Sequence, residues 1–302
     1  MSAGADSLRS IFFALGANLL IAIAKTGGAV FTGSASLLAE AIHSYADCAN
    51  QVLLIWGLRE GRRPADAEHP LGYGKAIYFW SFIVALMLFS MGGLFSIYEG
   101  VHKLAEPAPI ANAWVAVAIL CFGIVAESVS LWGCLREVNK ERGEQSLWQW
   151  FRRSRQSELL VVFAEDIAAL CGLSCALVFI ALAMATGEPA WDAAGSICIG
   201  VLLVGVAVLV GIEVKSLLIG QGVEPEELAR MRRHLEAEPD VDVLFQLLTQ
   251  QLGTDAMVAV KARMREAPSA LALIERINAI EKRFRAAFPD VRWLFFEPDI
   301  AD

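Results

Sequence analysis

The stretch Ala35–Leu58 reads ASLLAEAIHSYADCANQVLLIWGL and is long enough to span a membrane, yet it carries polar residues in a regular pattern. A hydrocarbon core about 30 Å thick requires a helix of about 20 predominantly apolar residues. Glu40, His43, Asp47 and Asn50 follow one another at offsets of 3, 4 and 3, which places them on one stripe of a helix. Ionisable groups inside a bilayer are costly and usually mark function, so this stripe is the first candidate for a site.

The stripe admits two interpretations. His43 and Asp47 stand one helical turn apart, so their side chains can converge on one metal ion. Alternatively, the four residues form a polar network that ties neighbouring helices together inside the membrane. A single polar residue would favour the network, whereas four polar residues in one register favour the metal-binding interpretation.

Five further apolar runs of similar length accompany this one. The chain has 302 residues, of which 56% are hydrophobic and only 19% charged, fewer charges than a soluble protein carries. The first run is too long for a cleaved signal peptide, so we expect it to be retained. The fold class is therefore a membrane all-α bundle of six helices, predicted at Ile11–Phe31, Ala35–Leu58, Ala76–Tyr98, Trp114–Leu135, Glu158–Thr186 and Ala193–Gly220.

The positive charges alternate between the connections of these runs. The connection after the fourth run contains six Lys and Arg residues, whereas the connections after the first and fifth runs contain none. Cytoplasmic connections carry the excess of Lys and Arg, so both termini are predicted to be cytoplasmic. We expect a multi-pass protein of a bacterial inner membrane.

The pattern changes after Gly220, where charged residues become frequent and long apolar runs end. An α-β-β-α-β order predicts a small two-layer α+β domain, so residues 1–220 form a transmembrane domain and residues 221–302 a cytoplasmic one. The net charge is −8 and no basic block is present, so nucleic acid is not an expected partner. The predicted elements are Glu224–Glu238, Val241–Gln250, Ala256–Arg265, Ser269–Ala287 and Val291–Phe296.

The fifth apolar run contains a second group of buried charges, the neighbours Glu165 and Asp166. Two carboxylates buried together repel unless a cation joins them, and a metal ion facing the second run or a shared proton would do so. A salt bridge to Lys25 of the first run is the alternative. Glu127 in the fourth run is a weaker candidate for a proton path, and Asp192 is as readily explained as the N-cap of the sixth run.

The loop after the second run contains Asp66, Glu68 and His69, followed by Gly72 and Gly74. The three ionisable residues could bind a metal ion. The two glycines could equally mark a tight turn into the third run, and the sequence leaves both interpretations open.

Three stretches resemble the cation diffusion facilitator family: Ser34–Asp47, His69–Lys75 and Phe295–Asp299. The resemblance implies a homodimer in the lipid bilayer that exports zinc or a similar divalent ion in exchange for protons. It also implies that the C-terminal α+β domain is ferredoxin-like and cytoplasmic. No cofactor is expected, because the metal ion is the substrate.

The same resemblance implies a tetrahedral site built from a (His/Asp)-x-x-x-Asp pair on each of the second and fifth helices. Val162 stands where the family usually has the His or Asp of the second pair, so one ligand is missing. A neighbouring carboxylate, an amide or water could take its place. The form Glu-Asp-x-Ala-Ala resembles the zinc transporter nine branch in particular. The expected metal-binding residues are His43, Asp47, Asp166, Glu165 and Asn50.

The function expected from these features is proton-coupled efflux of divalent metal cations from the cytoplasm. One imidazole with several carboxylates admits zinc, but also manganese, iron(II) and cobalt, and fewer nitrogen ligands favour harder ions. Zinc is the first expectation, and manganese or iron(II) is the alternative. No nucleotide-binding loop occurs, which leaves the proton gradient as the driving force. A non-transporting membrane metal sensor is a second alternative. A metal-dependent membrane enzyme is not expected, because the sequence offers no separate nucleophile or substrate motif.

Overall fold

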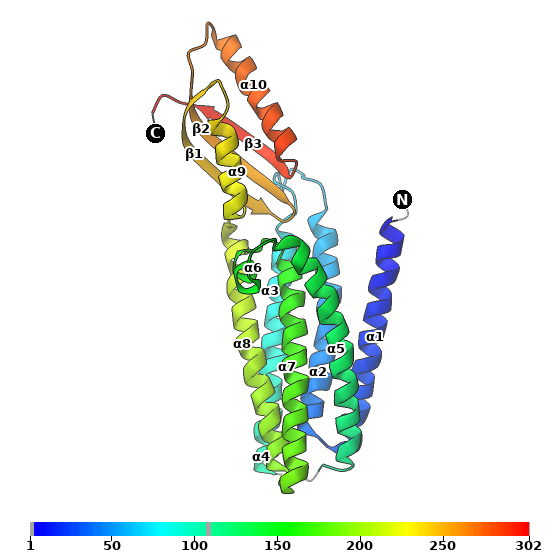
Figure 1. The fold of residues 1–302 in the computed structure, drawn as a ribbon. Helices are drawn as coiled ribbons and strands as arrows, with labels where there is room; N and C mark the ends of the chain where they lie inside the picture. Colours follow the sequence, from blue (N-terminus) through cyan, green and yellow to red (C-terminus); the bar gives the residue numbers. More distant parts are fainter. Residues whose placement is uncertain (1–2, 107–109, 302) are drawn as a thin grey trace. The chain divides into compact units, whose positions relative to one another are not determined.

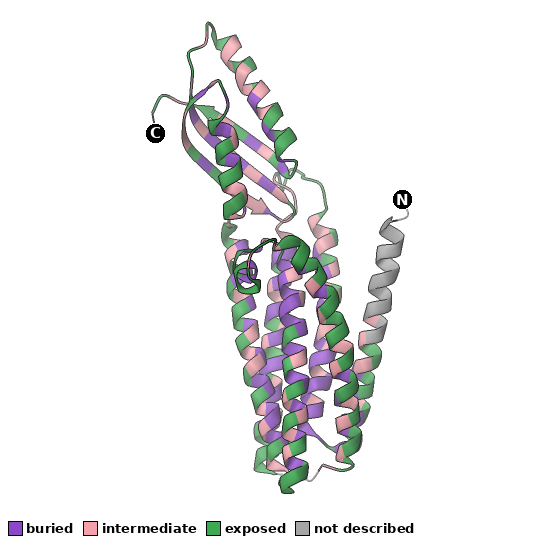
Figure 2. Ribbon diagram, viewed as in Figure 1, coloured by how far each residue is buried: buried purple, intermediate pink, exposed green. Residues whose placement is uncertain are grey.

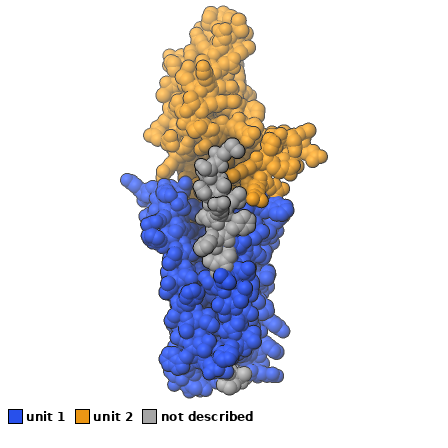
Figure 3. Space-filling view, turned by 90° about the vertical axis from the view of Figure 1, so that its right-hand side faces the viewer, with its two compact units in different colours: residues 1–56, 80–147, 158–213 blue, residues 57–79, 148–157, 214–302 orange. Residues whose placement is uncertain are grey.

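The computed structural model describes residues 3–106 and 110–301. The chain forms two compact units (Figure 3). The first contains residues 1–56, 80–147 and 158–213, and the second contains residues 57–79, 148–157 and 214–302. Two connections between helices therefore pack with the C-terminal residues rather than with the helices that they join.

All six predicted apolar runs are helical, and the long helices of the first unit run alongside one another (Figure 1). The third run is continuous but changes its winding, because a π-helical segment, η1, separates α3 from α4. The helices up to residue 220 are α1 Ala3–Thr32, α2 Ala35–Gly61, α3 Ala76–Met87, η1 Leu88–Leu94, α4 Phe95–Ala105, α5 Ala113–Glu141, α6 Leu147–Arg153, α7 Ser157–Thr186 and α8 Ala190–Gly220.

Four described helices are long and apolar enough to cross a membrane: Ala76–Ala105, Ala113–Glu141, Ser157–Thr186 and the one that begins with α8 at Ala190. The polar stripe in the middle of α2 reduces the hydropathy of that helix. In the described part of α1, Asn18–Thr32 forms an apolar helical segment. The sequence prediction is thus confirmed for four spans, and for α1 and α2 it remains a prediction.

The helices of this bundle differ in how much of their surface other helices cover (Figure 2). In the most apolar window of α7, 39% of the residues are buried, against 17% for α5. The exposed residues of α5 include Phe122, Val125 and Val129, all large and apolar. An apolar helix face of this kind suits contact with lipid rather than with water.

Glycines bring α8 unusually close to the neighbouring helical segment. A Cβ atom on Gly200 would lie 2.7 Å from the carbonyl oxygen of Gly93 in η1, and one on Gly100 in α4 would lie 2.7 Å from that of Ala193. Small residues let helix backbones approach where no hydrophobic force drives association in lipid. These glycines therefore let η1 and α4 pack closely against α8.

Asp192, in the first turn of α8, caps a different helix from the one predicted. Its carboxylate accepts hydrogen bonds from the backbone N–H of Ala35 at 2.6 Å and of Ser36 at 3.2 Å, and from the Ser34 hydroxyl at 2.7 Å. The Lys103 ammonium lies 3.7 Å away. Asp192 is fully buried. The expected role as N-cap of the sixth run is corrected: this carboxylate satisfies the first N–H groups of α2.

The second unit contains the predicted α-β-β-α-β order. Strands β1 and β2 are antiparallel, β2 and β3 are parallel, and the sheet order is β1-β2-β3. The Ser269 hydroxyl accepts a hydrogen bond from the Ala272 N–H at 3.2 Å, which confirms the predicted N-cap. The elements are α9 Pro225–Glu236, β1 Val241–Leu252, β2 Asp255–Met264, α10 Ala270–Ala287 and β3 Val291–Pro298.

One face of this sheet forms the core of the second unit. Helix α9 packs against β1 and α10 against β3. Alternate residues of β2, Val258 and Val260 among them, point to these helices, as the two-residue period of a strand requires. Leu248 and Phe295 remain 61% and 56% exposed.

The loop after α2 belongs to the second unit and contacts the turn between β1 and β2. A Cβ atom on Gly74 would lie 2.0 Å from the carbonyl oxygen of Leu252, so only glycine fits there. Gly72 has a φ of +75°, which favours glycine as well. The Tyr78 hydroxyl accepts a hydrogen bond from the Gly253 N–H at 3.0 Å. These contacts support the tight-turn interpretation of the two loop glycines.

Candidate metal site

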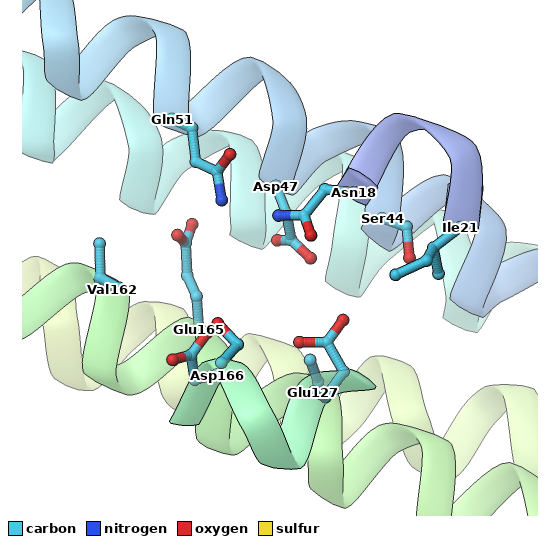
Figure 4. A pocket seen from close by; sticks show the side chains of 11 residues that line it. Asn18, Ile21, Ser44, Asp47, Gln51, Glu127, Val162, Glu165 and Asp166 are labelled. Atoms are coloured by element: carbon cyan, nitrogen blue, oxygen red, sulfur yellow. Dashed lines mark hydrogen bonds between the residues drawn. The ribbon is translucent and has the colours of Figure 1, made fainter. Parts of the chain in front are cut away.

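Side chains from α1, α2, α5 and α7 surround one cavity of about 40 Å³ inside the first unit (Figure 4). A water molecule requires roughly 10–15 Å³ measured in this way, so the cavity can hold an ion with some water. The residues that line it are Asn18, Ile21, Ser44, Asp47, Gln51, Glu127, Ser130, Val162, Glu165, Asp166 and Ala169.

Helix α2 presents Ser44, Asp47 and Gln51 to this cavity, at offsets of 3 and 4 that keep them on one stripe. Asp47 is the member of the predicted stripe that lines the cavity. Asn50 lies beside it and donates a hydrogen bond from its Nδ2 to Glu165 Oε1 at 2.5 Å. The residues of α2 that face the cavity are therefore Ser44, Asp47 and Gln51, and of the predicted stripe they include Asp47 alone. Both sets belong to the same broad polar face of the helix.

Helix α7 contributes both predicted carboxylates. Figure 4 shows Glu165 extending towards α2, with Asp166 at the cavity beside it. Asp166 Oδ1 accepts a hydrogen bond from the Ser130 hydroxyl of α5 at 3.1 Å. Val162 also lines the cavity, so the position that lacks the expected ligand is next to the space an ion would use.

His43 is fully buried but does not line the cavity. Its Nδ1 lies 3.6 Å from Asp47 Oδ1. The π-helical segment η1 also lies close to this nitrogen, since a Cβ atom on Gly92 would be 3.7 Å from it. The structure thus brings Asp47, Glu165 and Asp166 together at the cavity. Asn50 joins them through its hydrogen bond to Glu165, and His43 contacts Asp47 from outside the cavity lining.

Several polar atoms of these residues are buried without a hydrogen-bond partner among the described residues. They include both ring nitrogens of His43, Asp47 Oδ1, Asn50 Oδ1 and Asp166 Oδ2. A buried donor or acceptor without a partner costs about 1–3 kcal/mol. So many unpaired atoms in one place suggest that a cation, water or both complete the interactions.

Within the described part of the chain, no three His, Cys, Asp or Glu side chains converge closely enough to hold a metal ion directly. A cation in this cavity would therefore need water to complete its coordination in this conformation.

Lys25 pairs with a carboxylate other than the one considered from the sequence. Its ammonium lies 3.3 Å from Glu40 Oε2 and donates to the Ser44 hydroxyl at 2.7 Å. Both Lys25 and Glu40 are fully buried, and Gly172 of α7 leaves room for the Glu40 carboxylate. The alternative of a salt bridge from Lys25 to Glu165 or Asp166 is corrected, since Lys25 instead joins α1 to α2.

In the exposed loop after α2, the Asp66 side chain stabilises a turn. Asp66 Oδ1 accepts hydrogen bonds from the N–H groups of Glu68 at 3.0 Å and His69 at 2.7 Å, and Oδ2 accepts one from the Tyr73 hydroxyl at 2.8 Å. The Tyr73 bond, followed by the His69 N–H bond, holds the pKa of Asp66 below its ordinary value. Because both oxygens are already used, this geometry favours the turn over a loop metal site.

The sequence reasoning missed part of the cavity wall. Neither Ser44 nor Gln51 is ionisable, but Ser44 lies three residues before Asp47 and Gln51 four residues after it, so both are in helical register with it. Ser130 stands three residues after Glu127 on α5, so these two share a face. Helical spacing from the charged residues would have found all three.

Comparison with known proteins supports this picture of the first unit. The family profile described as the cation efflux transmembrane domain matches residues 11–219. The chain is 34% identical over 226 residues to the mitochondrial proton-coupled zinc antiporter SLC30A9 of Xenopus laevis, which covers 74% of this chain and 40% of that protein. It is 31% identical over 249 residues to metal tolerance protein C4 of Arabidopsis thaliana, covering 82% of this chain and 54% of that protein.

A bacterial relative is matched over a larger share of its own length. The chain is 25% identical over 241 residues to the cation-efflux pump FieF of Klebsiella pneumoniae, covering 78% of this chain and 74% of the pump. By contrast, the matches span only about half or less of the antiporter and of the metal tolerance protein.

Proposed function

Because the chain belongs to the cation efflux family, the cation diffusion facilitators, we propose that it exports zinc from the cytoplasm in exchange for protons. Divalent metal efflux across a membrane is the activity of this family, whose members are transporters rather than enzymes. The zinc and the proton coupling are the finer part of the proposal. They are supported by the antiporter relative, which is named for both.

The observation that carries the proposal is the set of buried, unpaired polar atoms around one cavity between α2 and α7. Asp47 and Asp166 approach it from the two helices, and each has a carboxylate oxygen without a partner among the described residues. Burying such groups without compensation is unfavourable, and most unfavourable in lipid. A divalent cation that enters from water would compensate both at once.

We further propose that His43, Asp47, Asp166 and Glu165 bind the ion, with Asn50 orienting Glu165. His43 can reach an ion bound by Asp47 after a small movement, because its Nδ1 is 3.6 Å from Asp47 Oδ1. An imidazole has an unperturbed pKa of about 6.5, so proton binding on the far side of the membrane could displace the ion. The same residues would then carry metal one way and protons the other.

The assembly and location of the transporter are part of the proposal as well. Cytoplasmic termini in a bacterial inner membrane agree with the alternation of Lys and Arg between the connections. A homodimer through a ferredoxin-like C-terminal domain agrees with the family resemblance, and the exposed Leu248 and Phe295 leave apolar surface for it.

Transport is tested with the purified protein in liposomes that contain a zinc dye and a pH dye. Zinc added outside should enter the lumen, and the luminal pH should rise as protons leave. Asp47→Asn should abolish both signals, because it removes a charge that α2 presents to the cavity. Glu137→Gln, an exposed position paired with Lys140 on α5, is the control and should transport normally.

The outcomes separate the alternatives. Zinc binding without flux would identify a metal sensor, and zinc flux without a pH change would exclude proton coupling. Manganese, iron(II) and cobalt are compared in the same assay. If manganese or iron(II) is transported faster than zinc at equal concentration, that ion is the preferred substrate and the proposed efflux function still holds.

A further inference from the structure

Glu127 of α5 belongs to the same cavity, although neither its helix nor its position was assigned to the metal site. Figure 4 shows its carboxylate pointing between the helices towards Asp47. Among the described residues, no side chain donates a hydrogen bond to this carboxylate or forms an ion pair with it. The Glu127 side chain therefore stands in a partly buried position with its charge facing the cavity.

The polar wall of this cavity carries oxygen and amide groups, and His and Cys side chains are missing from it. Carboxylates come from α2, α5 and α7, and the remaining polar groups are amides and hydroxyls. Beside Glu127, the Asp166 side chain of α7 also offers a free acceptor atom: Asp166 is 9% exposed, and its Oδ2 has no hydrogen-bond partner among the described residues. Oxygen ligands and water suit hard or hydrated divalent ions.

The distances decide how such an ion is held. Since no three ionisable side chains converge at ligand distance within the described residues, water would complete the coordination of an ion in this cavity, and Glu127 can act through that water. The cavity of about 40 Å³ has room for an ion with a few waters. Four carboxylates around so small a space would attract a divalent ion strongly when they are deprotonated, because partial burial weakens solvent screening.

We propose that Glu127 is a cation-binding residue of the transporter, which holds the hydrated divalent ion through water in an oxygen-lined cavity before the ion reaches His43. This inference rests on the proposed efflux function and adds a third helix, α5, to a site otherwise divided between α2 and α7. Because Glu127 acts through its charge, its contribution is similar for zinc and manganese. His43 supplies nitrogen, and its loss affects zinc more.

The test measures initial rates of zinc and manganese uptake into liposomes for Glu127→Gln, with Glu137→Gln as the matched control on the same helix. Groups that bind a metal through a second layer of contacts typically change its affinity 10–100-fold, so we expect the KM of Glu127→Gln to rise about tenfold for both ions. The kcat should stay within about twofold, because an interaction made equally in all states changes KM alone. Glu137→Gln should match the wild type.

A second variant, Glu127→Asp, keeps the inference testable if Glu127→Gln does not fold. Withdrawing the carboxylate by one carbon weakens its attraction without removing it, so KM should rise about threefold. The inference is supported if KM is lowest for the wild type, higher for Glu127→Asp and highest for Glu127→Gln. A KM within twofold of wild type in the Glu127→Asp protein, and in Glu127→Gln where it folds, would overturn it. Absence of flux in the wild type would instead overturn the efflux function, so the two failures are distinguishable.

Discussion

At the scale of single residues, Val162 and Glu165 are the two positions of α7 that bear on the proposed replacement of the missing ligand. Val162 replaces an expected ligand, yet it still lines the cavity. Glu165, three residues further along α7, points at the same space and is held by the Asn50 amide at 2.5 Å. A residue three positions away lies on the same face of a helix, so a neighbour can replace a lost carboxylate without a change of fold.

This substitution leads to a test of two alanine variants. Glu165→Ala should raise the dissociation constant for zinc at least about tenfold, because it removes a charge and releases Asn50. Val162→Ala removes only methyl groups from the cavity wall and should leave zinc affinity within about twofold. Both constants are measured by titration of the purified protein. Equal and negligible effects would exclude Glu165 as the replacement ligand.

At the scale of the helices, the start of α2 depends on a residue more than 150 positions away. The backbone N–H groups of Ala35 and Ser36 are satisfied by the Asp192 carboxylate of α8 rather than by a residue of their own segment. Lys103 of α4 adds its charge to the same carboxylate. Three helices are therefore joined at one point, at one end of the helix that carries His43 and Asp47.

Removing this carboxylate should destabilise the bundle measurably. Loss of a helix cap costs about 0.5–2 kcal/mol, and the Lys103 charge also loses its partner, so Asp192→Ala should lower the free energy of unfolding by about 2 kcal/mol or more. Asp192→Asn keeps an acceptor oxygen and should cost less. Unfolding in detergent measures both. Glu188→Ala, an exposed position just before α8, should be neutral; a similar loss there would argue against the cap.

At the scale of the whole molecule, the order of charged and uncharged connections predicts which ends of the helices face the cytoplasm. The connection between α5 and α7 is rich in cations, and the one between α7 and α8 has none. Metal export requires this orientation, because the ion must enter from the cytoplasmic side.

Cysteine labelling in intact cells tests the orientation. In a background without the natural cysteines, Glu188→Cys should react with a membrane-impermeant maleimide added outside. Glu144→Cys should react only after the membrane is opened. Both positions are exposed, so accessibility within the protein does not limit either reaction. The opposite pattern would reverse the orientation, and with it the direction of transport.

The sequence by itself determined the features that depend on local patterns. Apolar length places the membrane helices, and helical spacing places Asp47 and Asn50 near one face. Strand alternation, together with a capping serine, defines the C-terminal α+β domain. The carboxylates of the fifth run were also found from sequence, because charge in an apolar run stands out wherever it folds.

Only the tertiary structure decided which distant groups meet. Lys25 forms an ion pair with Glu40, and Asp192 accepts hydrogen bonds from the first residues of α2. Glu127 lines the same cavity as Asp47 and Asp166. Spacing along the chain defines the face of a helix, but the rotation and neighbours of that helix depend on packing against others, here through close glycine contacts. Partners between helices therefore follow from packing, which no local pattern in the sequence encodes.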